Sequence, residues 1–275
     1  MESIEHPLGE ADLPGCLALS KAAHWNQNEA DWRLMLEFGH GWGISIGGAL
    51  AASTLVLPYG GDFAWVSMVL VLPEHRRKGF ASRLLRTAIG DMATRGLTPV
   101  LDATPAGRAV YAREGFSDRW GFTRFFVKER KAPSATEGQA RPLREADWKA
   151  ILELDREAFG ASREKVLRAL HRRLPQAAWV VEGKGFIFGR DGREANQIGP
   201  LIAVDAGSAR TLLSRALAAV HPPLYVDAAD HADLATFVSE LGFALQRPFT
   251  RMVHGARAAP GRQELNFLVA GPELG

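Results

Sequence analysis

The stretch that decides the fold is Val69-Leu-Val-Leu-Pro-Glu-His-Arg-Arg-Lys-Gly-Phe-Ala-Ser82. An apolar run over 64–72 predicts a buried strand that ends before Pro73. A basic turn follows, and a helix is expected from about Ala81, because apolar residues then recur at helical spacing (Leu84, Leu85, Ala88, Ile89 and Met92). A helix start behind a cationic loop binds phosphate, because unpaired N–H groups and the helix dipole both favour an anion.

The spacing within this stretch is more specific than a generic anion-binding turn. Val71-x-Pro73-x-x-Arg76-x-x-Gly79-x-Ala81 resembles the acetyl-CoA motif of the GCN5-related N-acetyltransferase (GNAT) superfamily, V-x-P-x-x-[QR]-x-x-G-x-[GA], at every defined position. Neither the Walker pattern G-x-x-x-x-G-K-[ST] nor the dinucleotide-binding pattern G-x-G-x-x-G is present here. The small side chains of Gly79 and Ala81 would let a ligand approach the backbone.

The resemblance implies an acetyl-CoA site on this strand, loop and helix start. The pyrophosphate is expected on backbone N–H groups of residues 77–82, near three cations. The residues expected to contact the cofactor are Val69, Leu70, Val71, Arg76, Arg77, Lys78, Gly79, Phe80, Ala81, Ser82 and Thr104.

Composition excludes several classes of protein. The 275 residues suffice for two domains, and 47% hydrophobic with 23% charged residues is typical of a globular chain. A net charge of +2 gives no reason to expect nucleic-acid or membrane partners. Cys16 is the only cysteine and lies in an apolar helical pattern, so we expect a small core residue and a reducing compartment. The acidic N-terminus lacks a secretory pattern, which favours a cytoplasmic protein, and no metal site is predicted.

The polar segment after the first helix is the candidate acceptor wall. After His24 the sequence reads Trp25-Asn-x-x-x-x-Asp31-Trp32, and its polar residues separate one helical pattern from the next. One interpretation makes the tryptophans core residues and Asn26 a turn former. The other follows from the resemblance, since the first two helices of the superfamily form one wall of the acceptor pocket. It assigns His24, Trp25, Asn26 and Asp31 to substrate binding.

The strands around the motif carry two further expectations. Residues 41–57 predict two strands joined by a turn at Gly47-Gly48. In the superfamily the strand before the loop carries a bulge that separates it from its neighbour and lets pantetheine bind its backbone. The sequence itself does not reveal such a bulge.

Tyr111 is the candidate catalytic residue. Thr104 and Pro105 begin a helix that ends at Gly115, where a left-handed residue is expected. The Tyr111-x-x-x-Gly115-Phe pattern resembles the superfamily, whose tyrosine points at the CoA sulfur. The other interpretation is a tyrosine of the core.

The second half repeats the first. Residues 131–140 are rich in polar and small residues and are interpreted as a linker between a catalytic domain (1–130) and a second domain (141–275). Glu145-Ala-Asp147 echoes Glu10-Ala-Asp12 at an offset of 135, and the order of predicted strands and helices is the same. The fold class is therefore α/β (α+β mixed sheet). It consists of two GNAT-like domains, each with a mixed, mostly antiparallel sheet flanked by helices.

The second copy is interpreted as degenerate for the cofactor. Its strand passes to its helix through a shorter loop that opens on an acid, Asp205, and lacks the Arg-x-x-Gly-x-Ala pattern. Val238 stands where the first copy has Tyr111. Its Ile198-Gly-Pro-Leu pattern resembles the second domain found beside such acetyltransferases. The apolar run 265–270 is expected to be a final strand or a strap against the other domain.

The resemblance implies direct transfer of acetyl from acetyl-CoA to an amine. A lysine-like amine has a pKa of ~10.4, so a base or desolvation must expose its lone pair. The strand 65–72 contains no carboxylate, and the base stays open among His24, Asp31, Asp102 and a water relay. Tyr111 is the candidate acid for the leaving thiolate.

The predicted activity is an acyl-CoA N-acyltransferase that acetylates a primary amine of a small molecule or peptide. Acetyl-CoA is its only expected cofactor, and the expected state is a monomer or homodimer. The alternative is a non-catalytic sensor that binds acyl-CoA or a metabolite. A DNA-linked role for the basic run 75–78 is disfavoured, because the pyrophosphate already accounts for it.

Overall fold

The computed structural model describes residues 2–129, 139–230, 232–255 and 257–275. The predicted linker therefore lies almost wholly outside the described residues. Within the described ranges, no helix is both long enough and apolar enough to span a bilayer. The first half contains β1 (Ser3–Pro7), α1 (Leu13–Ala22), α2 (Glu29–Phe38), β2 (His40–Ile46), β3 (Ala49–Pro58), β4 (Phe63–Val71), α3 (Phe80–Thr94), β5 (Thr98–Ala103), α4 (Pro105–Arg113) and β6 (Phe116–Val127).

The second half follows the same order. It contains β7 (Arg141–Pro142), α5 (Trp148–Phe159), α6 (Glu164–Arg173), β8 (Trp179–Val181), β9 (Gly185–Arg190), β10 (Asn196–Ala203), α7 (Ala206–Ala219), β11 (Leu224–Ala229), α8 (Ala232–Glu240), β12 (Ala244–His254) and β13 (Asn266–Leu268).

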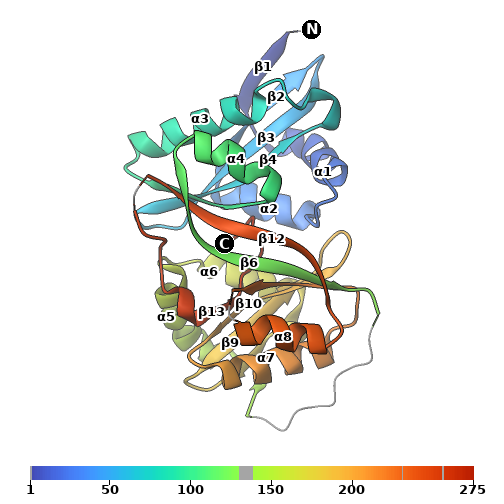
Figure 1. The fold of residues 1–275 in the computed structure, drawn as a ribbon, viewed down its shortest axis with the longest axis vertical. Coiled ribbons are helices and arrows are strands. Elements are labelled where there is room, and N and C mark those ends of the chain that lie inside the picture. The colour runs from blue at the N-terminus through green and yellow to red at the C-terminus, as the bar shows by residue number, and fades with distance from the viewer. Residues whose placement is uncertain (1, 130–138, 231, 256) are drawn as a thin grey trace.

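All these strands join in one sheet. Its order is β1-β2-β3-β4-β5-β12-β6-β11-β13-β10-β9-β8-β7, and helices pack along it in both halves (Figure 1). Pairing is antiparallel except between β4 and β5 and between β10 and β11. The α/β class with a mostly antiparallel sheet is thus confirmed. The sequence did not predict that the two half-sheets are continuous.

The halves exchange strands at the centre of this sheet. β12, from the second half, lies between β5 and β6 of the first, and β6 in turn pairs with β11 (Figure 1). Two buried ion pairs hold the exchange. Arg124 on β6 donates to Asp227 on β11 at 2.7 and 2.7 Å, and Arg251 on β12 donates to Asp102 on β5 at 2.9 and 2.9 Å.

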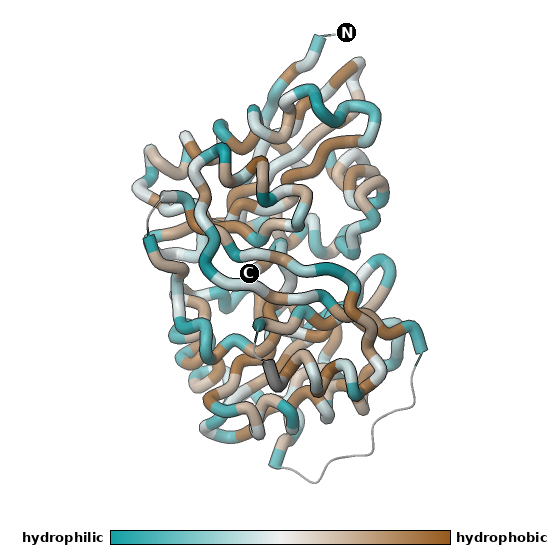
Figure 2. Tube along the Cα trace, viewed as in Figure 1, coloured by the Kyte–Doolittle hydropathy of each residue, from teal (hydrophilic) through white to brown (hydrophobic). Residues whose placement is uncertain are grey.

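Apolar packing also crosses between the halves. Phe159 of α5 lies 4.8 Å from Tyr59, 5.5 Å from Phe63 and 5.7 Å from Trp65, measured between ring centroids. Apolar stretches occur in the strands and helices of both halves, with hydrophilic residues between them (Figure 2). One buried cluster contains residues of both halves, so neither half buries its core alone.

The local expectations around the motif are confirmed. The strand before the loop is buried, and α3 begins at Phe80, one residue from the predicted start. Gly47 and Gly48 have φ of 58° and 83°, as a tight hairpin turn requires. Gly115 has φ of 92° at the end of α4. Cys16 is fully buried in α1, and burial raises the pKa of its thiol to about 12, so it is a core residue.

Candidate functional site

The start of α3 presents free backbone donors. Gly79 is the N-cap with φ of 80°, a left-handed conformation that favours glycine, and no side chain caps the helix. The first helical hydrogen bond runs from Arg83 N–H to Gly79 O at 2.9 Å. The N–H groups of residues 80–82 therefore have no intrahelical acceptor and can bind an anion.

The cations before this helix are available to a ligand. Arg76, Arg77 and Lys78 are exposed, and none forms an ion pair with a described residue. Arg76 Nε contacts Val71 O at 3.3 Å, and Lys78 Nζ contacts His75 Nδ1 at 3.3 Å. Cations with no protein counter-charge favour phosphate groups.

The strand that leads into the loop is bulged and separated from its neighbour. Leu55 pairs with Ser67 and Ser53 with Leu70, so Met68 and Val69 face a single residue of β3. Met68 has φ of 51°, and Ser53 Oγ donates to its carbonyl at 2.8 Å. Pairing between β4 and β5 stops at Trp65 and Val100. Beyond that point the strands leave backbone groups free to bind an extended ligand.

A groove of about 590 Å³ runs along this separation. Its lining includes Arg76 and Ala81, beside the start of α3, together with residues of β4 and α4. Its full lining is Ala23, Trp25, Val69, Leu70, Val71, Arg76, Ala81, Asp102, Thr104, Pro105, Ala106, Gly107, Val110, Tyr111 and Arg247. A ligand with a phosphate end and an extended arm fits this shape.

The groove leads to a narrow inner cavity of about 30 Å³ between β4 and β5. Six residues line both spaces: Trp25, Val69, Asp102, Thr104, Tyr111 and Arg247. The residues that line the inner cavity alone are Gln27, Val66, Ser67, Met68, Leu101, Arg124, Phe249, Pro272 and Glu273. This volume holds one or two water-sized groups, so only reacting groups fit there.

Six predicted cofactor residues line the groove: Val69, Leu70, Val71, Arg76, Ala81 and Thr104. Thr104 also caps α4, since its Oγ1 accepts from Gly107 N–H at 3.2 Å. The other five, residues 77–80 and Ser82, lie on the loop and the first turn outside the lining.

The four predicted acceptor residues are not brought together. Trp25 lines both the groove and the cavity. Asn26 instead binds the second half, since Nδ2 donates to Ala195 O at 2.9 Å and Oδ1 accepts from two backbone N–H groups. Asp31 is fully buried between Arg190 and Arg173, and His24 is exposed. None of these three lines either space.

Gln27, Arg247 and Glu273 are among the lining residues that sequence reasoning missed. Glu273 lies 206 positions from Ser67, whose hydroxyl donates to its carbonyl at 3.0 Å. The one available signal was the apolar run 265–270, interpreted as a strand or a strap. It is both, because β13 is a strand and the residues after it pack against β4.

Tyr111 stands where the groove meets the inner cavity. Burial raises its pKa to about 12, so the phenol stays protonated at physiological pH. No hydrogen bond to its hydroxyl is found in the described part of the chain, and its ring lies 6.1 Å from Phe116. Such a phenol is a free donor for a ligand atom in the cavity.

In the second half, protein atoms occupy the positions that correspond to the free helix start and to the gap between the two strands. Asp205 caps α7, and its carboxylate accepts from Ser208 N–H at 2.7 Å. β13 pairs with both β10 and β11, so a strand occupies the gap that is open between β4 and β5. Both features disfavour an anionic cofactor in this half.

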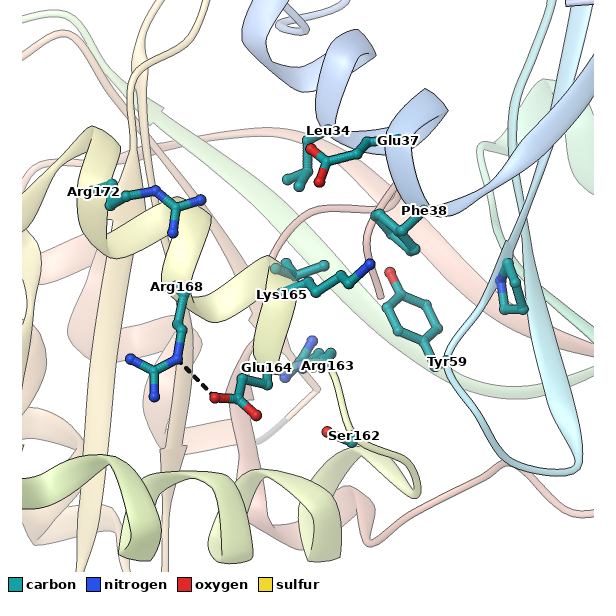
Figure 3. A pocket seen from close by; sticks show the side chains of 12 residues that line it. Leu34, Glu37, Phe38, Tyr59, Ser162, Arg163, Glu164, Lys165, Arg168 and Arg172 are labelled. Carbon is teal, nitrogen blue, oxygen red and sulfur yellow. Dashed lines mark hydrogen bonds and ion pairs between the residues drawn. The ribbon is translucent and has the colours of Figure 1, made fainter.

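A separate cavity of about 560 Å³ lies between the halves. Figure 3 shows Leu34, Glu37 and Phe38 of α2 facing Lys165, Arg168 and Arg172 of α6 across it. Tyr59 and Arg163, which also line it, donate to the carbonyls of Leu274 and Gly275. The segment 272–275 thus contacts two residues that line this cavity and contributes Pro272 and Glu273 to the lining of the inner cavity.

Two family models match the chain. One, described as "Acetyltransferase (GNAT) family", matches residues 13–116, and another, described as "Acetyltransferase (GNAT) domain", matches residues 151–268. No curated protein matches the chain.

Solved structures share the fold over nearly the whole length. A proposed acetyltransferase from Pyrococcus horikoshii has a TM-score of 0.83 at 19% identity, covering 99% of this chain and 96% of that one. A GCN5-related N-acetyltransferase from Sphaerobacter thermophilus has a TM-score of 0.67 at 17% identity, with 95% and 98% covered. A tandem GNAT protein of clavulanic acid biosynthesis has a TM-score of 0.60 at 16% identity, with 95% and 100% covered. At these identities the likeness concerns the fold.

Proposed function

Since the chain is a tandem GNAT-like protein, we propose that its first half transfers acetyl from acetyl-CoA directly to a primary amine of a small molecule or peptide. One observation carries this proposal. A single groove runs from the free N–H groups of α3, along the separated edges of β4 and β5, to the hydroxyl of Tyr111.

Each part of the groove has a role in the proposed reaction. The pyrophosphate lies on residues 76–82, and pantetheine takes the place of a strand beside β4. Backbone N–H groups at the bulge polarise the thioester carbonyl. A phenol with a pKa of about 12 is a weaker acid than a thiol of pKa ~8.5. Tyr111 therefore stabilises the leaving thiolate by a hydrogen bond rather than by full proton transfer.

Calorimetric titration with acetyl-CoA, combined with a CoA-release assay over a panel of amines, tests the proposal. We expect binding together with turnover of at least one amine. Tight binding without turnover of any amine would contradict the proposal and support a sensor. Absence of binding would contradict both functions.

Tyr111→Phe is expected to lower kcat about 100-fold, the usual effect of removing one donor to a transition-state charge, with acetyl-CoA Kd within twofold of wild type. Because the pKa of Tyr111 is raised, its donor form persists as the pH rises. The ratio of wild-type to variant kcat should therefore stay constant from pH 7 to pH 10, measured by CoA release.

Tyr225→Phe is the matched control, because this buried tyrosine lines neither the groove nor the inner cavity. Its kcat is expected within threefold of wild type. An unchanged kcat in Tyr111→Phe would remove Tyr111 from the mechanism, whereas a ratio that falls to one by pH 10 would contradict the raised pKa of its phenol.

A further inference from the structure

Two residues that line the inner cavity each carry a buried hydrogen-bond acceptor with no donor among the residues that the structure describes. Glu273 is 2% exposed, its Oε1 accepts from Arg190 Nη2, and its Oε2 is buried with no partner. Gln27 is also 2% exposed, and its Oε1 is likewise buried without a donor. A buried acceptor without a donor costs free energy, so both oxygens favour a ligand that carries N–H groups.

The backbone around Glu273 is held in a fixed place beside the β4 bulge. Trp65 Nε1 donates to Pro272 O at 3.0 Å, and Ser67 Oγ donates to Glu273 O at 3.0 Å. Tyr59 Oη donates to Leu274 O at 2.9 Å. Three donors from the first half thus position a carboxylate that belongs to the second.

The other carboxylates near the cavity are already neutralised. Asp102 lines it, but both of its oxygens accept from Arg251, which is stacked between Trp65 and Trp120. Asp227, outside the lining, pairs with Arg124 at 2.7 Å through each oxygen. Glu273 is the cavity-lining carboxylate with a free oxygen among the residues that the structure describes.

With Glu273, the ion network that it joins has one more carboxylate than it has guanidinium groups. Arg190 is already bound by Asp31 at 2.9 and 2.9 Å, and Arg173 is bound by Asp31 and Asp191 at 2.6 Å each. Two guanidinium groups thus face three carboxylates. A cationic or proton-donating ligand at the free oxygen would balance the third.

A spare positive charge stands at the mouth of the same cavity. Arg247 lines both the cavity and the groove. Among the described residues, its Nε has no hydrogen-bond partner and no carboxylate pairs with its guanidinium group. Burial, and then the neighbouring Arg124, lower the pKa of Arg247. A carboxylate on the ligand would offset both the burial of Arg247 and its repulsion by Arg124, since guanidinium groups bind carboxylates through two parallel hydrogen bonds.

We infer that the acceptor is a primary amine that carries a carboxylate, an amino acid in the broad sense, held between Arg247 and Glu273 of the second half. This inference rests on the proposed acetyl transfer. The small inner volume admits the amino group, and the acceptor carboxylate lies at Arg247, which also lines the wider groove. A neutral primary amine has two N–H groups and one lone pair. The N–H groups match the free oxygens of Glu273 and Gln27, and the lone pair attacks the thioester carbon.

The proposed step balances without a further reactant. The amine nitrogen forms a bond to the acetyl carbon, the C–S bond breaks, and its electron pair leaves on sulfur. One nitrogen proton passes to Glu273 Oε2, and the thiolate, bound by Tyr111, takes a proton from water. Glu273 then returns its proton to solvent.

Matched pairs of amines test the acceptor class. CoA release is measured with glycine and methylamine, with β-alanine and ethylamine, and with lysine and cadaverine. At least one amino acid is expected to exceed its carboxylate-free partner about 100-fold in kcat/KM. Arg247→Met should reduce that preference below fivefold, mainly through the KM of the amino acid, with acetyl-CoA Kd changed less than threefold.

Glu273→Gln tests the proton acceptor, because it keeps the side-chain volume and an oxygen for Arg190. Its kcat is expected to fall about 100-fold on every accepted amine, at unchanged acetyl-CoA Kd. Asp155→Asn is the control. It neutralises another buried carboxylate, which binds Arg163 and so supports the same segment, but it lines neither space. Its kcat should stay within threefold.

The outcomes separate the two proposals. Equal turnover of both members of every pair, or an unchanged preference in Arg247→Met, overturns the acceptor class while the acetyl transfer stands. An undiminished kcat in Glu273→Gln, or an equal loss in Asp155→Asn, overturns the role of Glu273. Absence of turnover on every amine overturns the acetyl transfer itself and this inference with it.

Discussion

Residues 1–130 produced without the second half are expected to be insoluble and not to bind acetyl-CoA. β12 supplies the ladder partner for the facing edges of β5 and β6. Its removal would expose two strand edges. It would also expose the apolar side chains that now pack against Phe249, Met252 and Val253 of β12. It would further remove Arg251, which is the ion-pair partner of Asp102 on β5. Soluble yield and calorimetric titration with acetyl-CoA measure the result.

The control is the same chain cut between its halves, with residues 131–138 left out. Residues 1–130 produced together with residues 139–275 contain every strand that the structure describes. The break falls between β6 and β7. This pair is expected to copurify and to bind acetyl-CoA within threefold of the intact protein. A soluble fragment 1–130 that binds acetyl-CoA unaided would show that the exchanged strand is dispensable.

Ala81→Glu is expected to raise the Kd of acetyl-CoA about 100-fold. The new carboxylate lies in the first turn of α3, where it would bind the free N–H groups and repel the pyrophosphate. Two like charges about 4 Å apart interact with ~4 kcal/mol at an effective dielectric constant of ~20, and a 100-fold loss needs about 2.7 kcal/mol. In the second half an acidic residue, Asp205, is the N-cap of the corresponding helix α7.

Two variants separate this local effect from net charge. Gly90→Glu adds the same charge to an exposed position of α3, where an added Cβ meets no atom within 4 Å, and its Kd is expected within twofold of wild type. Lys78→Ala removes one exposed cation, worth less than about 1 kcal/mol, so Kd should rise less than about fivefold. A larger loss in Lys78→Ala than in Ala81→Glu would contradict the backbone as the main pyrophosphate ligand.

Gly79→Glu should also raise the Kd of acetyl-CoA more than Lys78→Ala does, because φ of 80° strains any side chain.

The cofactor end could be predicted from the sequence because its parts are contiguous. A strand, a loop with left-handed Gly79 and a helix start are local structures, and residues 69–82 contain all three. The bulge at Met68 was expected only from the family resemblance, since no residue type requires it. In the structure the bulge has a partner outside its own strand, since Ser53 on β3 donates to the Met68 carbonyl.

The acceptor end could not be predicted in the same way. Trp25 was predicted there and lines the cavity, but Asn26 and Asp31 bind the second half instead. Their polarity was visible in the sequence, and their partners were not. A buried polar side chain can satisfy either a ligand or a distant segment, and only the three-dimensional arrangement distinguishes the two.

The sequence by itself thus determined the class of fold, the repeat and the anion-binding turn, because hydrophobic period and turn chemistry act over a few residues. The tertiary structure decided that β12 lies within the first half of the sheet and that the segment after β13 reaches the inner cavity. It thereby placed Glu273 and Arg247 in the lining of the same inner cavity as Tyr111. Such contacts join residues more than a hundred positions apart, and they depend on how two repeated halves pack rather than on any local preference.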